Sequence, residues 1–151
     1  MLLDGYMMFS NGQALTAVGT VDSANVLDTQ NARDLGIGED QTLKIFVQTG
    51  NALLSSGATT LVVSLQGSTD ASTWTTMATS GSVTKANLTA AGTRIWSVDM
   101  PRPVAGQALP RYYKLTYAIG TTDFTSGTVN AGIVLDDQAN VQYPAGLTVG
   151  N

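Results

Sequence analysis

The segment "RYYKLTYAIGTTDFTSGTVNAGIVLD", residues 111–136, carries the clearest structural pattern of the chain. Apolar side chains occupy every second position in both of its halves: Tyr113, Leu115, Tyr117 and Ile119, then Val129, Ala131, Ile133 and Leu135. A period of two places alternate residues on opposite faces of a β-strand, so we predict two strands with one core face each. The intervening "GTTDFTSG" is typical of a hairpin loop.

The same alternation recurs upstream in "TLKIFVQT" from Thr42 and in "TTLVVSLQGS" from Thr59, while "TGNALLSSGA" between them suits a loop. "TRIWSVDM" predicts a further strand, which stops at the loop "MPRPVAGQALP" because proline cannot donate ladder hydrogen bonds. Fainter strands are "QALTAVGT", "ANVLDT" and "WTTMATS". About eight strands predict an all-β, two-sheet antiparallel sandwich of jelly-roll or immunoglobulin-like type, in a single domain of residues 1–151.

Composition restricts the chemistry. The 151 residues include no His and no Cys, which removes the usual general base, the thiolate nucleophile and the preferred zinc ligands. A net charge of -4 has the wrong sign for binding phosphates. The N-terminus has Asp4 where a signal peptide carries a basic residue, and no apolar run reaches membrane-spanning length. We expect a soluble protein made in the cytoplasm, without catalysis, cofactor or metal, and without nucleic-acid, membrane or small-molecule partners.

The two ends of the chain differ from its middle. Residues 1–12 and 138–151 together carry one charge, Asp4, yet they are rich in apolar side chains. Disordered tails are usually polar and charged, so we predict two arms that pack on another protein. Their candidate interaction residues are Leu3, Tyr6, Phe9, Tyr143, Pro144 and Leu147.

The stretch "NARDLGIGED", residues 31–40, concentrates charge in Arg33, Asp34, Glu39 and Asp40. Its glycines lead into a strand through two carboxylates, unlike a phosphate-binding loop, and it lacks the ligand spacing of an EF-hand. An irregular cation site that includes Asp28 stays open as a minor alternative. The favoured interpretation is a structural bend whose four charged residues are available for contacts with a partner.

Two other features allow a functional interpretation. Asp136 and Asp137 are adjacent, so on a strand they point to opposite faces and cannot flank one glycosidic bond. Trp74 and Trp96 are candidates for sugar-stacking platforms, although core packing is the commoner role of a sandwich tryptophan.

Several sequence blocks, taken in their order along the chain, resemble the small jelly-roll cement, or decoration, proteins that bind tailed-bacteriophage capsids. The blocks are "LLDGYMMFSNGQALT", "RDLGIGED", "ALPRYYKLTYAIGTTDFTSGTVNAGIVLDDQ" and "YPAGLTV". This resemblance implies a jelly-roll fold, a place on the virion exterior, and the major capsid protein and further copies of the chain, as dimer or trimer, as partners. It also implies that "RDLGIGED" is a turn of the scaffold. The alternative is a carbohydrate-binding sandwich of a phage tail or cell surface that uses Trp74, Trp96 or the tyrosines.

Overall fold

The computed structural model describes residues 4–35, 43–102 and 106–135, and all statements below concern these ranges. They contain two single 3-10 turns, η1 (Gly5–Met7) and η2 (Lys85–Asn87), and no α-helix. The strands are β1 (Met8–Ala14), β2 (Gly19–Asp22), β3 (Leu27–Asp28), β4 (Lys44–Leu54), β5 (Thr60–Ser68), β6 (Thr75–Thr84), β7 (Arg94–Asp99), β8 (Tyr112–Gly120) and β9 (Ser126–Val134). No helix in these ranges is long and apolar enough to cross a membrane.

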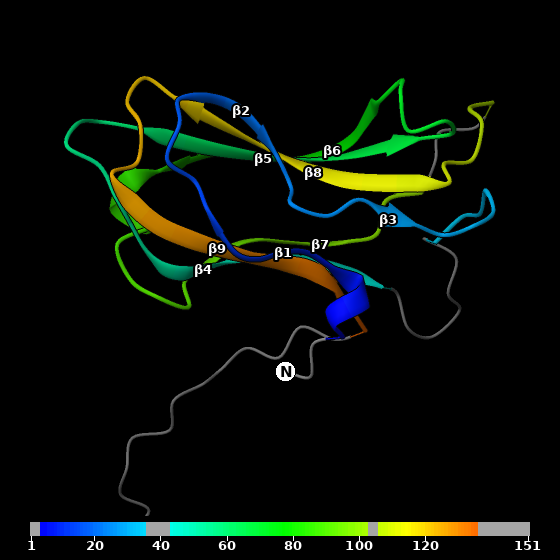
Figure 1. Ribbon diagram of the computed structural model, residues 1–151, viewed down its shortest axis with the longest axis horizontal. Helices are drawn as coiled ribbons and strands as arrows, with labels where there is room; N and C mark the ends of the chain where they lie inside the picture. Colours follow the sequence, from blue (N-terminus) through cyan, green and yellow to red (C-terminus); the bar gives the residue numbers. More distant parts are fainter. Residues whose placement is uncertain (1–3, 36–42, 103–105, 136–151) are drawn as a thin grey trace, which may run out of the picture.

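Two antiparallel sheets lie face to face, as Figure 1 shows. The order β1-β9-β4-β7 forms one sheet, and β2-β8-β5-β6 forms the other, with β3 also paired to β8. β2 and β3 pair with successive parts of the same side of β8, so they act as one interrupted strand. The sandwich then has eight strands, in which the first pairs with the last and the second with the last but one. This nesting is the jelly-roll topology, and it confirms the predicted fold class.

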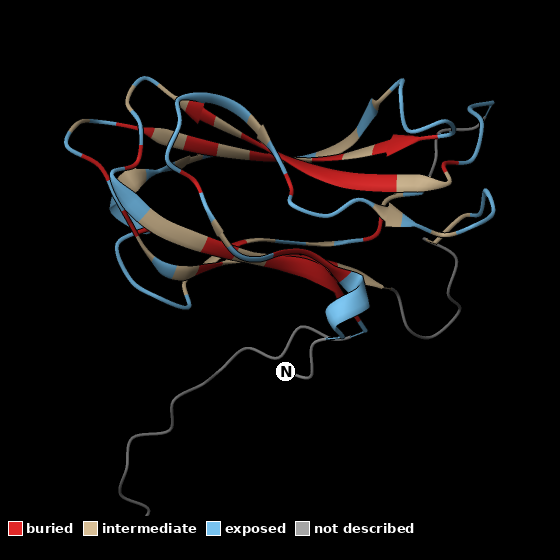
Figure 2. Ribbon diagram, in the orientation of Figure 1, coloured by how far each residue is buried: buried red, intermediate tan, exposed pale blue. Residues whose placement is uncertain are grey.

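The core lies between the facing sheets, where buried residues concentrate (Figure 2). The predicted inward row of β8, from Tyr113 to Ile119, is 0–3% exposed, which confirms its register. A fully buried row of β5 lies beside it in the same sheet, and one of β4 faces it from the other sheet: Leu61, Val63 and Leu65, and Ile45 and Val47. The apolar alternation therefore identified the inner faces of the long strands correctly.

Several local predictions were wrong, among them the strand expected at residues 13–20, which is interrupted between Ala14 and Gly19. Leu135 is 64% exposed because β9 ends at Val134 and no longer directs alternate residues inward. Residues 49–54 continue β4 instead of forming a loop, since two register shifts against β9 absorb the irregular sequence and Leu53 enters the core. Residues 120–127 do not close a hairpin, because β8 and β9 belong to different sheets and buried Phe124 fills the crossing.

The N-terminal arm is shorter than predicted. β1 begins at Met8 and pairs with β9, and Phe9 is 1% exposed within the core. The neighbouring Ser10 hydroxyl lies 2.7 Å from the Tyr117 hydroxyl of the opposite sheet, so β1 also joins the two layers. Residues 8–12 are thus part of the sandwich, and Phe9 is a core residue, not an interaction residue. Leu3 and the C-terminal arm, residues 138–151, lie outside the described ranges.

Candidate interaction surface

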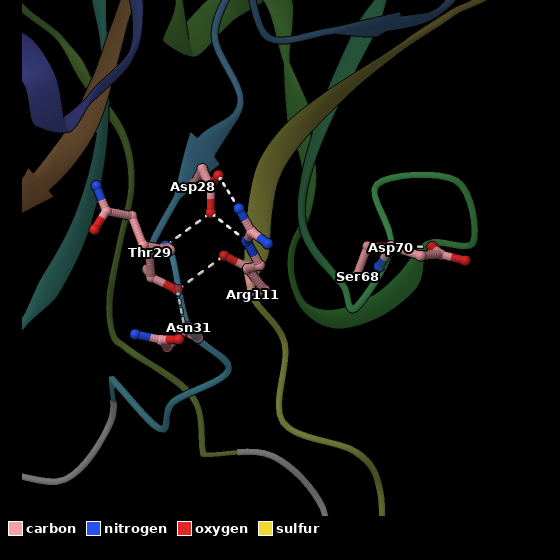
Figure 3. A network of polar contacts seen from close by, with 7 residues as sticks. Asp28, Thr29, Asn31, Ser68, Asp70 and Arg111 are labelled. Atoms are coloured by element: carbon pink, nitrogen blue, oxygen red, sulfur yellow. Dashed lines mark hydrogen bonds and ion pairs between the residues drawn. The ribbon is translucent and has the colours of Figure 1, made fainter.

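A polar network joins β3, β8 and β5 at one end of the second sheet (Figure 3). The Arg111 guanidinium donates to both carboxylate oxygens of Asp28, at 2.7 and 2.8 Å. The backbone N–H and the hydroxyl of Thr29 both donate to the carbonyl of Arg111, and the Arg111 N–H donates to the carbonyl of Ser68. The bidentate pair fixes the chain before residues 31–35, and no local pattern in the sequence predicts this role of Arg111.

Hydrogen bonds next to this network hold residues 31–35 in place. The N–H of Arg33 donates to the Pro110 carbonyl, and the Tyr113 hydroxyl donates to the Arg33 carbonyl at 3.1 Å. Leu35 packs against the core, while Arg33 is exposed and Asp34 half-buried. The segment is therefore anchored through its backbone, as a structural bend requires. Glu39 and Asp40 lie outside the described ranges.

Two carboxylates in this region are held in their charged form. The hydrogen bond from Arg111 lowers the pKa of Asp28. The pKa of Asp70 is lowered further, first by the Ser72 hydroxyl and then by the N–H groups of Thr73 and Ser72. Asp70 thereby closes the β5–β6 loop. Both carboxylate oxygens of Asp28 are hydrogen-bonded to Arg111. No group of three metal-ligating residues occurs in the described ranges, so these ranges do not support the alternative of a cation site that includes Asp28.

The two tryptophans do not form an aromatic floor. The Lys114 ammonium lies 4.5 Å from the centre of the Trp74 ring and donates to Asp22 at 2.7 Å. Trp96 is partly buried against the core, because a bulge between β4 and β7 lets both Ile95 and Trp96 pack there. A sugar-stacking platform needs a bare ring face, whereas Lys114 covers one face of Trp74 and Trp96 packs against the core. The glycosidase candidates Asp136 and Asp137 lie outside the described ranges.

Two hollows occur in the described part of the chain, with volumes of about 310 and 260 Å³. Lys85 is the titratable residue of the first, and its ammonium donates to the carbonyls of Ser55 and Gly57. The second lies between Gly67, Met77 and Pro110 and is lined by no titratable residue. The Lys85 ammonium in the first hollow is already hydrogen-bonded to backbone carbonyls, and the second hollow offers neither an acid nor a base.

The outer face of the first sheet carries an unusual apolar cluster. Met8, Phe46 and Val134 are 0–7% exposed there, separate from the core between the sheets. The backbone of Met7 crosses close to Gly132, where an added Cβ would lie 2.9 Å from the Met7 carbonyl. Beside this cluster, Tyr6 is 92%, Met7 43% and Leu135 64% exposed. Tyr6 and Met7 directly precede β1, which pairs with β9, and Leu135 directly follows β9, so both ends of the described chain lie at this side of the sheet (Figure 1).

Of these three exposed residues, the sequence pattern predicts one, Tyr6, as an interaction residue. Met7 lay within the predicted arm without being singled out, and Leu135 was assigned to the core. The charged pair Asp136 and Asp137 directly after Leu135 is a signal that the buried strand ends there.

These features define the chain as a jelly-roll sandwich, with Tyr6, Met7 and Leu135 among the exposed apolar residues of its described part. The family model described as Bbp16 matches residues 9–133, which run from the second residue of β1 to the last but one of β9. The chain belongs to the Bbp16 family. No curated protein matches the sequence.

Proposed function

We propose that the chain is a capsid decoration, or cement, protein of a tailed bacteriophage. It binds the outer surface of the head between capsomers and stabilises the shell of the major capsid protein without turnover. Further copies of the chain, as a homodimer or homotrimer, are its second partner. The virion exterior is its location, after assembly in the host cytoplasm.

One observation supports the proposal: the sequence blocks that resemble cement proteins coincide with strands that form the frame of the sandwich. The longest block contains β8 and β9, which are inner strands of the two sheets, and the opening block contains η1 and β1. The resemblance therefore includes the strands that define the fold, not only its loops. Exposed apolar side chains such as Tyr6 and Leu135 are of the kind that protein partners cover.

The proposed mechanism uses binding free energy alone. A shell presents the same contact at many copies, so a modest affinity per copy is multiplied over the particle. Each added apolar or hydrogen-bonded contact of about 1 kcal/mol then raises the free energy needed to open the shell. A carbohydrate-binding sandwich is the weaker candidate, because the rings of Trp74 and Trp96 are occupied by Lys114 and by the core.

The test uses heads that lack this protein. Purified full-length chain is added to such heads, and its occupancy is counted by cryo-electron microscopy. We expect ordered density on the outer surface at capsomer junctions and a higher temperature of head disruption. Absence of bound density at a saturating protein concentration would overturn the proposal. In a separate measurement, binding of the chain to glycans on an array would favour the carbohydrate-binding candidate.

A further inference from the structure

Strand β1 contains the single Asn-Gly pair of the sequence, Asn11 and Gly12. A register shift in the pairing of β1 with β9 leaves these two residues together opposite Asn130. Two residues opposite one make a β-bulge, and Gly12 adopts a φ of 64°, a conformation that favours glycine. Both residues are exposed, although their strand belongs to the frame of the sandwich.

An Asn-Gly pair is a reactive sequence, because glycine has no side chain to hinder attack by its own backbone nitrogen. That nitrogen can attack the carbonyl carbon of the asparagine side chain, so that a new C–N bond closes a succinimide ring. The side-chain nitrogen leaves as ammonia and takes the proton that the backbone nitrogen gives up. Water then opens the ring at either carbonyl and produces aspartate or isoaspartate. The net reaction exchanges an amide for a carboxylate and consumes one water.

In the folded chain a neighbouring side chain holds the attacking nitrogen. The Gly12 N–H donates to the side-chain carbonyl of Asn130 at 2.6 Å, a short distance for a bond of this type. Ring closure requires this nitrogen to lose its proton and to turn from the extended strand backbone toward the Asn11 side chain. Both changes break the hydrogen bond to Asn130, so this bond opposes the reaction.

The acceptor is placed by an inner strand and the donor by an edge strand. β9 lies between β1 and β4, so Asn130 is also paired on its other side, with Gln48 of β4. Gly50 leaves room for the half-buried Asn130 side chain, since an added Cβ there would lie 3.2 Å from its Nδ2 atom. Edge strands open more easily than inner strands, so Asn130 keeps its position when β1 opens locally.

We propose that Asn11 is a site of spontaneous deamidation and that the hydrogen bond from Gly12 to Asn130 sets its rate. Conversion is slow while β1 is paired, and it accelerates when β1 opens or the acceptor is lost. Isoaspartate inserts one more carbon into the backbone of β1, next to Ser10, whose hydroxyl lies 2.7 Å from that of Tyr117. Accumulated conversion therefore weakens the first strand of the sandwich.

The experiment incubates the full-length chain at mildly alkaline pH, below its melting temperature, and follows each asparagine by tandem mass spectrometry. Asn130→Ala removes the acceptor, whereas Asn130→Asp keeps an acceptor oxygen and is the matched control. The unmodified chain unfolded in guanidinium chloride gives the rate without restraint. Asn51 is the internal reference, because it is exposed but precedes an alanine. Near-ultraviolet circular dichroism verifies that each variant is folded.

We expect folded Asn130→Ala protein to convert Asn11 about fivefold faster than the unmodified chain, the effect of losing one hydrogen bond. Asn130→Asp should keep the unmodified rate, and the unfolded chain should convert faster than the folded one. Equal rates in Asn130→Ala and the unmodified chain would overturn the role of Asn130. Conversion of Asn11 no faster than that of Asn51 in the unfolded chain would overturn the site itself. Asn130→Val, which also lacks an acceptor and suits a strand, replaces Asn130→Ala if that variant is unfolded during incubation.

Discussion

Leu115 illustrates how single residues hold the two sheets together. It lies in the middle of the inward row of β8 and is fully buried. Replacing it with alanine removes apolar contact and leaves a cavity, so we expect Leu115→Ala to lower the free energy of unfolding by about 2–5 kcal/mol. Urea denaturation followed by fluorescence measures this change. Leu135→Ala is the control, since an exposed leucine should change stability by about 0.5 kcal/mol or less.

Two buried tyrosines give the protein a defined response to alkaline pH. Burial, with a smaller contribution from the charge of Asp34, raises the pKa of Tyr113 from 10.0 to about 12. Burial also raises the pKa of Tyr117, against the opposing effect of its hydrogen bond with Ser10. Above pH 10 these side chains ionise in the unfolded chain before they ionise in the folded one. The contribution of the two tyrosines to stability should therefore be constant up to about pH 10 and fall as the pH rises toward 12.

Chemical denaturation at a series of pH values tests this response. The Tyr113→Phe variant should lose less stability between pH 10 and 12 than the unmodified chain, because one of the two linked ionisations is removed. An identical alkaline slope in both proteins would contradict the assignment.

The two ends of the chain differ at the scale of secondary structure elements. Deleting residues 1–12 removes five of the seven residues of β1, including buried Phe9 and the link from Ser10 to Tyr117. Losing Phe9 alone is expected to cost about 3–5 kcal/mol, a large part of the stability of a single domain. We therefore expect the truncated protein not to fold, as measured by near-ultraviolet circular dichroism and melting.

Deleting residues 138–151 has a different expected result. All nine strands stay intact, so the melting temperature should remain nearly unchanged while head binding or self-association weakens. A large fall in melting temperature on this deletion would show that the C-terminal segment contributes to the stability of the sandwich, and would contradict its prediction as an arm.

At the scale of the whole molecule, the expected assembly is a symmetric homo-oligomer. The nearly uncharged ends of the sequence predict interfaces of about 1,200–2,000 Å² in total. Multi-angle light scattering should give a mass of two or three chains of 15.7 kDa. A monomer at all concentrations up to those found during assembly would contradict this prediction and leave the head shell as the remaining protein partner.

The sequence alone determined the fold class and the inner faces of the long strands. Alternation in β4, β5 and β8 is a local property, because the pleat of each strand sends neighbouring residues to opposite faces wherever the strand lies. The absence of His and Cys likewise restricts chemistry independently of the fold. Predictions of this kind needed no knowledge of which strands are neighbours.

Tertiary structure decided the features that depend on distant pairing. β1 and β9 are more than a hundred residues apart, and only their pairing converts "MFSNG" from an apparent arm into part of a core strand. Pairing with β9 likewise keeps residues 49–54 in strand β4, although their glycine-containing sequence is typical of a loop. Leu135 lies at the surface and not in the core, because β9 ends before it. The Asp28–Arg111 pair joins positions 83 residues apart. Local patterns carry no information about these neighbours, because burial at an irregular position is set by the elements that pack against it.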